Sequence, residues 1–338
     1  MKYIFELNHP KHYYQFKYVM QILHNHGHEI LVLARDKDVL LNVLDEENVS
    51  YTIFGKHNKT MMKKVLGTFS LVGNYVSIAR RFHPDVIVSK ASLYGVVTAR
   101  IIGCKSIIFP DSEVVKVTNK YVVPLCSQVV TPQPFQLNYG VKHVRIAGIF
   151  EDCYLSPQVF HPDKAVVEKY GLTKPYAIIR FVGWFANHDV GNKGFSFDDK
   201  IQLVKSVSKY MRVYISVEGP LPEELSEYRL PTPASVIHDV LSSADLYIGD
   251  SQTMAAEAAL LGTPAIRSNS FVGPNDMSNF VMLQNRNLLK NIAKPNEAIE
   301  KAEEFASQSQ KSIWLSRREK YYEQVGDINA FIVSLLEK

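Results

Sequence analysis

The chain of 338 residues lacks the marks of a membrane-spanning or secreted protein. No window approaches 18 uncharged apolar residues, and the start MKYIFELNHPKHYY has neither the apolar run nor the small-residue cleavage site of a signal peptide. Its three cysteines are too few and too widely spaced to suggest a disulfide framework or a zinc site. We therefore expect a cytoplasmic protein whose cysteines stay reduced.

The motifs of several ligand-binding classes are also missing. Neither G-x-x-x-x-G-K-[ST] nor G-x-G-x-x-G occurs, so the sequence lacks the usual phosphate loops of kinases, ATPases and dehydrogenases. The basic residues have no RNP-like motif, zinc-finger spacing or helix-turn-helix signature near them, which argues against nucleic acid as a partner. His24, His26 and His28 form an H-x-H-x-H run, but no carboxylate or cysteine spacing completes a metal site around them. We expect no bound metal.

The basic side chains are concentrated in the first half of the chain. The net charge is +4, yet residues 1–150 hold 18 Lys and Arg against 10 Asp and Glu. Much of this excess lies in KHNKTMMKKVLGTFSLVGNYVSIARR, residues 56–81, where apolar and basic residues are mixed. Such a segment can make peripheral contact with an anionic membrane. An ordinary helix with one core-facing side and one solvated basic side has the same pattern.

Apolar β-rich runs alternate with helical patterns, which predicts an α/β fold with parallel sheets. In residues 1–148 we expect strands at 2–7, 29–34, 51–54, 86–89, 106–109 and 128–131, with helices at 13–26, 37–47, 61–81 and 92–102. Residues 149–164 have an irregular pattern with two prolines, so they are the expected linker.

The pattern restarts after the linker. Residues 165–310 predict strands at 176–181, 212–216, 235–237, 245–248 and 264–266, with helices at 198–209, 239–243 and 253–261. Residues 295–338 have the pattern of two helices, and residues 311–338 could cross back to the first domain. The chain therefore predicts a GT-B-like architecture, in which two Rossmann-like parallel-sheet domains face each other across a cleft.

Residues 244–266, ADLYIGDSQTMAAEAALLGTPAI, have the pattern of a phosphate-binding site. A buried strand is followed by a polar turn and a short alanine-rich helix, so the unpaired N–H groups of the helix would point beyond the carboxyl end of the strand. Glu257 lies on the same helix face as Thr253 and could accept hydrogen bonds from ribose hydroxyls. The alternative is a plain capped helix. The candidate binding residues of this segment are Gly249, Ser251, Gln252, Thr253 and Glu257.

Candidates for a catalytic base follow two strands of the first domain. His9 and His12 lie where the first strand gives way to the first helix, and a neutral histidine there could take a proton from an acceptor hydroxyl. Either histidine could instead cap or pack at the turn. Asp111 and Glu113 follow the strand at 106–109, and one of these carboxylates could be the base.

Cations follow the first strand of the second domain. Arg180 and His188 in RFVGWFANHDVGNKG lie beside glycines, and cations near a flexible loop suit a departing diphosphate. Arg180 could instead be paired with a carboxylate. Glu218, Gly219 and His238 lie at further predicted strand ends, where backbone could hold the base of a nucleotide.

Six blocks that span nearly the whole chain resemble an uncharacterised archaeal and bacterial family known as a domain of unknown function. They are NHPKHYYQFKYVMQILHNHGHEILVLARD, FHPDVIVSKASLYGVVTARIIG, AGIFEDCYL, RFVGWFANHDVGNKGF, ISVEGPLPEEL and IHDVLSSADLYIGDSQTMAAEAALLGTPAIRSNSFVG. The family is placed beside UDP-N-acetylglucosamine 2-epimerases and the lipid-linked N-acetylglucosaminyltransferase of peptidoglycan synthesis. In those relatives the turn holds the diphosphate and a helix glutamate holds the ribose. Ser251, Gln252, Thr253 and Glu257 match those places.

The leading hypothesis is transfer of a sugar from a nucleotide diphosphate sugar, with UDP favoured, to a glycan or lipid-linked acceptor in surface polysaccharide synthesis. The second domain would hold the donor and the first the acceptor, with no cofactor and no metal. The first alternative is a non-hydrolysing nucleotide-sugar 2-epimerase, although RFVGWFANHD lacks the His-Arg-Arg-Glu-Asn run of those enzymes. The second is a non-catalytic nucleotide-sugar-binding protein.

Overall fold

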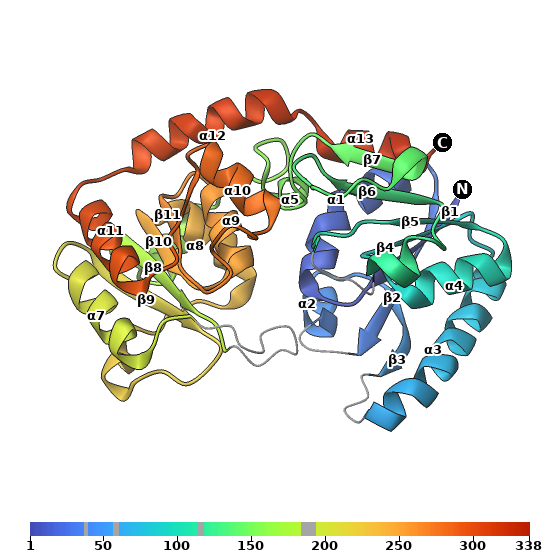
Figure 1. Cartoon of the computed structure of the whole chain (residues 1–338), viewed down its shortest axis with the longest axis horizontal. Coiled ribbons are helices and arrows are strands. Elements are labelled where there is room, and N and C mark those ends of the chain that lie inside the picture. Colours follow the sequence, from blue (N-terminus) through green and yellow to red (C-terminus); the bar gives the residue numbers. More distant parts are fainter. Residues whose placement is uncertain (37–39, 57–60, 114–117, 184–193) are drawn as a thin grey trace. The chain divides into compact units, whose positions relative to one another are not determined.

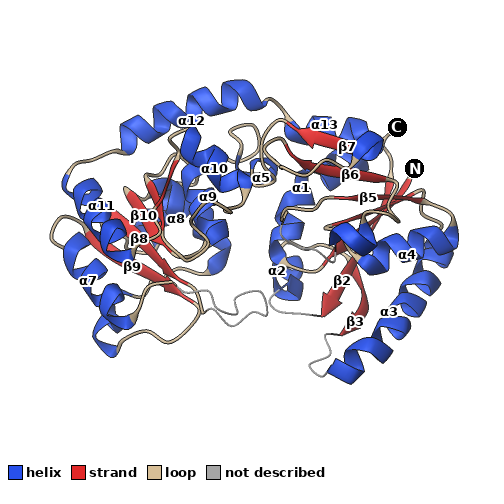
Figure 2. Cartoon of the chain, viewed as in Figure 1, coloured by secondary structure: helices blue, strands red, loops and turns tan. Residues whose placement is uncertain are grey.

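The chain forms two compact units, each built from a parallel sheet and helices (Figures 1 and 2). The computed structural model describes residues 1–36, 40–56, 61–113, 118–183 and 194–338, without the side chains of residues 56 and 61–69. Unit 1 comprises Met1–Tyr154 and Val325–Lys338, and unit 2 comprises Leu155–Gln324. The predicted α/β fold with two Rossmann-like domains is confirmed.

The sheet of unit 1 has seven strands in the order β3-β2-β1-β4-β5-β6-β7, and all its pairs are parallel. The strands are β1 (Lys2–Leu7), β2 (Glu29–Asp36), β3 (Tyr51–Lys56), β4 (Val86–Ser89), β5 (Lys105–Ile108), β6 (Gln128–Pro132) and β7 (His143–Ile146). The helices are α1 (Pro10–Asn25), α2 (Leu40–Glu46), α3 (Met61–Phe82), α4 (Leu93–Ile102) and α13 (Ile328–Leu336), with short turns at Thr118–Val122 and Gly140–Lys142. The strand order reverses between β1 and β4, and open α/β sheets bind ligands at such switch points.

Both faces of this sheet are covered, which explains why β1 is mostly apolar and is buried from Tyr3 to Leu7. The ring of Phe5 lies 5.5 Å from that of Phe16 in α1. On the opposite face, Ile4 belongs to a buried cluster with Tyr75 and Ala79 of α3. Successive side chains of a strand point to opposite faces, so each face of β1 supplies part of the core.

The sheet of unit 2 has five parallel strands in the order β12-β11-β10-β8-β9, which reverses between β8 and β10. The strands are β8 (Tyr176–Phe181), β9 (Arg212–Val217), β10 (Leu246–Gly249), β11 (Ala265–Arg267) and β12 (Leu289–Asn291). The helices are α6 (Ala165–Lys169), α7 (Phe197–Val207), α8 (Ile237–Ser243), α9 (Gln252–Leu260), α10 (Ser278–Asn285), α11 (Pro295–Ser307) and α12 (Lys311–Val325). Short turns occupy Glu223–Tyr228 and Ala234–Val236. One face packs under α7 and α11, where Leu203 and Ile299 join Ile179 and Ile248 in the core.

Several element predictions were wrong. The strand expected at 235–237 is a 3₁₀ turn that runs into α8, because three residues are too few for periodicity to separate strand from helix. Strands β7 and β12 were missed, since HVRI and LKN are short and lack a run of apolar residues. The carboxyl segment holds three helices rather than two, because Asp327 caps a new helix directly after Gly326, which has a φ of +68°.

Only part of the expected linker, residues 149–164, connects the two units, because its first residues belong to unit 1. The division between the units falls after Tyr154, inside this segment and inside the short helix α5 (Asp152–Leu155). Ile149, Phe150 and Cys153 are buried, so the start of the segment belongs to the core of unit 1. The three cysteines are unpaired, and Cys126 is buried like Cys153.

The first turn of helix α12 is hydrogen-bonded to the rest of unit 2. The buried ammonium of Lys311 donates hydrogen bonds of 2.7 and 2.9 Å to the carbonyls of Ser242 and Ala244, and one of 2.7 Å to the hydroxyl of Thr263. Trp314 Nε1 donates to the carbonyl of Leu288 at 2.7 Å. Helix α13 instead belongs to unit 1.

The basic segment at 56–81 forms the end of β3 and most of α3. The side chains of residues 56–69 lie outside the described part of the chain. Further along α3, Leu71, Tyr75, Val76 and Ala79 are buried, which is the pattern of a core-facing helix. Among the described residues, no helix combines the length and the apolar character needed to span a bilayer.

The close approach of β8 and β10 predicts that Gly249→Ala is destabilising. A Cβ at position 249 would lie 2.5 Å from the carbonyl oxygen of Arg180, and a backbone atom cannot move away cheaply. We expect a loss of about 1–3 kcal/mol in the free energy of unfolding, measured as a melting midpoint lower by several degrees. Gly73→Ala in α3 is the control, since a Cβ there meets nothing within 4 Å. Equal midpoints for the two variants would contradict this account.

Candidate functional site

The polar turn that follows β10 lies at the switch point of unit 2. Gly249 ends β10, and Ser251 is the N-cap of α9, where its hydroxyl accepts a hydrogen bond of 3.4 Å from the Met254 N–H. Gln252 and Thr253 form the first turn of α9, so their N–H groups are among those that a helix leaves unpaired. The N-terminus of α9 therefore faces the edge of the sheet at which β8 and β10 end, and it favours an anion there.

Asp250 joins the strand ends around this turn, although the sequence analysis did not select it. Its buried carboxylate accepts a hydrogen bond of 2.7 Å from the Val182 N–H, after β8. Its N–H donates to the carbonyl of Arg180 at 3.2 Å, and its own carbonyl accepts 2.9 Å from the amide of Asn269, after β11. The only sequence signal was a carboxylate placed directly after a buried strand.

Glu257 and His238 come together from two helices. Oε1 of Glu257 lies 3.3 Å from Nε2 of His238, and the two side chains are only 10 % and 13 % exposed. His238 is in the first turn of α8, so its predicted position at a strand end was wrong. A carboxylate can accept several hydrogen bonds at once, so this contact is compatible with ribose binding.

Arg180 contacts two polar side chains of β9 and the bend after it. Its guanidinium forms an ion pair with Glu218 and donates a hydrogen bond of 2.7 Å to the Ser216 hydroxyl. This is the carboxylate-paired alternative that the sequence left open for Arg180. Gly219 is half-buried in the bend after β9, while His188 falls in residues 184–193, outside the described part of the chain.

Buried polar atoms without a protein partner gather at the same sheet edge. Among the described residues, no hydrogen-bond partner occurs for Tyr247 Oη, Arg180 Nε or Ser268 Oγ. Burial raises the pKa of Tyr247 well above its usual value, despite the opposing effect of Arg180, so the hydroxyl keeps its proton and can donate. Unsatisfied buried donors are uncommon in folded proteins and often mark a place that a ligand or water occupies.

In unit 1, both predicted histidines make hydrogen bonds at the start of α1. His9 is the N-cap, and its Nδ1 accepts 3.1 Å from the Lys11 N–H. His12 Nδ1 accepts 3.2 Å from the Asn8 N–H, which places the proton of the neutral ring on Nε2. Burial and the nearby Lys90 ammonium hold the pKa of His12 well below its usual range. His12 is therefore neutral near pH 7 and presents an N–H donor.

Lys90, which the sequence analysis missed, follows β4 directly and is 4 % exposed. Its Nζ donates to Gln15 Oε1 at 2.8 Å, lies 3.3 Å from Asp111 Oδ2 and sits 4.0 Å above the ring of Phe150. Burial lowers the pKa of Lys90 to about 8, although Asp111 opposes this effect. Its signal in the sequence was a lysine at the end of the buried run VIVS.

Asp111 is the predicted carboxylate that joins this cluster. It follows β5 and lies 3.5 Å from Lys11 Nζ, which in turn lies 2.8 Å from Glu151 Oε1. Partial removal from water would raise the pKa of Asp111, but Lys90 and Lys11 outweigh it and hold the pKa below its usual value. Glu113 instead accepts a hydrogen bond of 2.8 Å from the Gln136 N–H.

The cluster around Lys90 lies at the switch point of unit 1, because His12, Lys90 and Asp111 follow the adjacent strands β1, β4 and β5. Here too, a buried polar atom, Nε2 of Gln15, has no partner among the described residues. Ala91, next to Lys90, has a φ of +65°, a conformation that is costly for alanine and is enriched at functional sites.

Two sequence comparisons place this chain beside uncharacterised proteins. Residues 2–148 match a family described as protein of unknown function (DUF354), so the resemblance to an uncharacterised family is confirmed for that part of the chain. Uncharacterized protein MJ0665 of Methanocaldococcus jannaschii is 22 % identical over 279 residues, which cover 77 % of this chain and 80 % of the relative.

Two solved structures are similar along almost their whole length. The UDP-GlcNAc 2-epimerase of Methanocaldococcus jannaschii has a TM-score of 0.69 and 11 % identity, with 100 % of this chain and 99 % of the other covered. Glycosyltransferase VinC, solved in complex with dTDP, has a TM-score of 0.66 and 10 % identity, with the same coverage. At this identity the likeness establishes a shared GT-B-like fold.

The environment of His12 predicts a pH dependence of stability. The folded protein resists protonation of His12 below pH 6.5 while the unfolded chain accepts the proton, so stability falls as the pH drops below 6.5. The loss is at most about 1.4 kcal/mol per pH unit. His12→Gln should flatten the decline of the melting midpoint between pH 7.5 and 5, since glutamine can still accept from Asn8. Parallel declines in the two proteins would show that His12 titrates normally.

Proposed function

We propose that the protein is a glycosyltransferase that moves a sugar from a nucleotide diphosphate sugar, with UDP favoured, to a glycan or lipid-linked acceptor. The observation that carries the proposal is the capped turn at Ser251, which opens α9 at the switch point of unit 2 beside unsatisfied buried donors. The family match and the shared fold support it. The proposal requires no metal and no additional cofactor.

In this proposal unit 2 holds the donor. The diphosphate lies at the N-terminus of α9, where the N–H groups of the Ser251–Thr253 turn and the hydroxyl of Tyr247 can donate to its oxygens. Glu257, one turn further along α9, accepts hydrogen bonds from the ribose. Arg180, whose charge acts on the hydroxyl of Tyr247, supports negative charge at the departing diphosphate, while Glu218 and Ser216 orient its guanidinium.

Unit 1 in turn activates the acceptor hydroxyl. Asp111 is the stronger candidate for the base, since its carboxylate is ionised near pH 7 and its side chain is 40 % exposed. His12 is a weaker one, because Nδ1 is already engaged and Nε2 carries the proton. We assign to His12 the role of a donor that orients the acceptor oxygen, and to Lys90 and Lys11 the role of keeping Asp111 ionised.

The basic character of the first half of the chain indicates where the reaction takes place. We infer surface polysaccharide synthesis at the cytoplasmic face of a membrane, where the basic segment 56–81 can contact anionic lipid and bring the enzyme to a lipid-linked acceptor. The excess of basic residues in the first half of the chain supports an anionic acceptor.

The donor site predicts that a nucleoside diphosphate raises the melting midpoint of the protein. A screen of UDP, GDP, CMP, dTDP and ADP with their sugar conjugates should give a shift with one nucleotide, since a ligand that binds the folded state stabilises it. Glu257→Gln should weaken that binding by roughly 1–3 kcal/mol, measured by calorimetry. Glu303→Gln is the matched control, because Glu303 is paired with Lys209 on the surface of the same unit. Unchanged affinity in Glu257→Gln would remove the ribose role.

A second prediction concerns the base. With the donor identified, Asp111→Asn should lower the turnover number for nucleotide release by about 10²–10⁴, whereas His12→Gln should lower it less. Glu29→Gln, which changes an exposed carboxylate of β2, is the control. A large loss in His12→Gln with normal turnover in Asp111→Asn would reverse the two roles. Formation of a 2-epimer from the nucleotide sugar alone would favour the epimerase, and binding without any turnover would favour a binding protein.

A further inference from the structure

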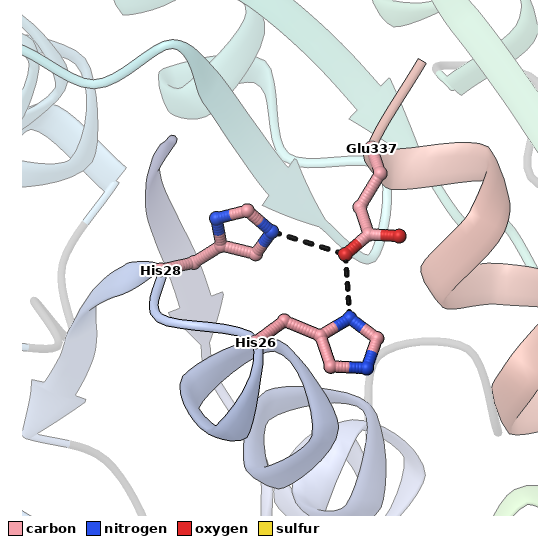
Figure 3. A group of neighbouring side chains, drawn as sticks. All are labelled: His26, His28 and Glu337. Atoms are coloured by element: carbon pink, nitrogen blue, oxygen red, sulfur yellow. Dashed lines mark hydrogen bonds and ion pairs between the residues drawn. The ribbon is translucent and has the colours of Figure 1, made fainter.

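The H-x-H-x-H run meets a carboxylate that comes from the other end of the chain. His26 is the C-cap of α1, His28 directly precedes β2, and Glu337 is the C-cap of α13. Figure 3 shows both imidazoles pointing at the carboxylate of Glu337. No spacing rule could reveal this partner, because it lies 309 positions from His28 in the sequence.

The geometry of these three side chains is close to that of a metal site. Oε1 of Glu337 lies 2.7 Å from His26 Nδ1 and 3.0 Å from His28 Nε2, and the ligand atoms all lie within 4.8 Å of one another. A tetrahedral ion with bonds of about 2.0–2.1 Å holds its ligand atoms about 3.3 Å apart. The two contacts would therefore lengthen by only about 0.3–0.6 Å to admit an ion.

Of the three side chains, His28 is held in place by its neighbours, whereas His26 and Glu337 are more exposed and can move. The side chain of His28 is 17 % exposed, its ring lies edge-on to Tyr3 at 5.4 Å, and its Nδ1 lies 3.0 Å from the N-terminal ammonium of Met1. Because an ammonium can only donate, this contact leaves the proton of the neutral ring on Nε2, and an ion that binds Nε2 displaces that proton. His26 is 49 % exposed and Glu337 32 %, so both can shift and an ion can reach them.

The donor atoms of the three side chains indicate which ions they would bind. Two imidazoles and one carboxylate suit Zn²⁺ and its neighbours among the transition metals, whereas Mg²⁺ and Ca²⁺ prefer oxygen ligands throughout.

We propose that His26, His28 and Glu337 bind one divalent transition-metal ion of the Zn²⁺ class, with water completing the coordination. The ion links the turn between α1 and β2 to the carboxyl end of α13. That end of the helix is also held by hydrogen bonds from Tyr3 Oη to the carbonyl of Leu336 at 3.0 Å and from Lys105 Nζ to the carbonyl of Lys338 at 3.2 Å. Metal binding therefore secures α13 on unit 1, and the proposal departs from the expectation of no bound metal, which was drawn from spacing alone.

The experiment is a titration of the full chain, freed of any affinity tag, with ZnCl₂ by calorimetry and by thermal shift. We expect one ion per chain and a higher melting midpoint. His26→Gln, His28→Gln and Glu337→Gln should each lose at least about ten-fold in affinity, since loss of a mere outer-shell partner already costs 10–100-fold. His24→Gln is the matched control, because His24 belongs to the same run but not to the cluster. MgCl₂ should not compete.

Three results would overturn the proposal. They are the absence of saturable Zn²⁺ binding, equal affinity in all variants, and an equal loss of affinity in His24→Gln. Glu337→Gln keeps the test informative if a histidine variant folds poorly, because Glu337 follows the last helical residue and is partly exposed. Neither the titration nor its outcome depends on nucleotide binding in unit 2.

Discussion

In both units each strand pairs with its neighbours in the parallel sense, so the carboxyl ends of all strands lie at one edge of each sheet. This constraint collects His12, Lys90 and Asp111 in unit 1, although they lie far apart in sequence. It also places the turn before α9 beside the end of β8 in unit 2. Because the strand order reverses at β1/β4 and β8/β10, successive loops lead away in opposite directions there, which leaves the strand ends accessible to a ligand.

The strands that could be predicted from the sequence are those that are buried on both faces of their sheet. Strands such as β1, β4 and β8 are covered on both faces, so each one is a short, mostly apolar run whose bounds could be predicted correctly. Strands β7 and β12 lie at sheet edges and include exposed or half-buried residues, so their composition did not distinguish them from loops. The segment 235–237 was misassigned because its β-branched residues serve a turn and the start of a helix.

The residues of the candidate site that could be predicted are those whose place depends only on the local sequence pattern. Ser251 and His12 lie next to strand ends, and local pattern alone places them there. What could not be predicted was pairing across segments, because it depends on which strands become neighbours. The contact of Lys90 with Asp111 and the ion pair of Arg180 with Glu218 are of this kind. Such contacts decide protonation and orientation, so the sequence alone left the choice between the candidate bases open.

The membership of α13 in unit 1 has a consequence for how the protein is made. Ile332 and Leu336 of this helix are buried, and the helix packs against α1 and β7, elements that are synthesised long before it. During synthesis, the apolar surface of residues 1–154 that α13 will cover therefore stays exposed while all of unit 2 is translated. The amino-terminal unit becomes complete only when the segment after Gln324 emerges, so the first unit to be started is the last to be finished.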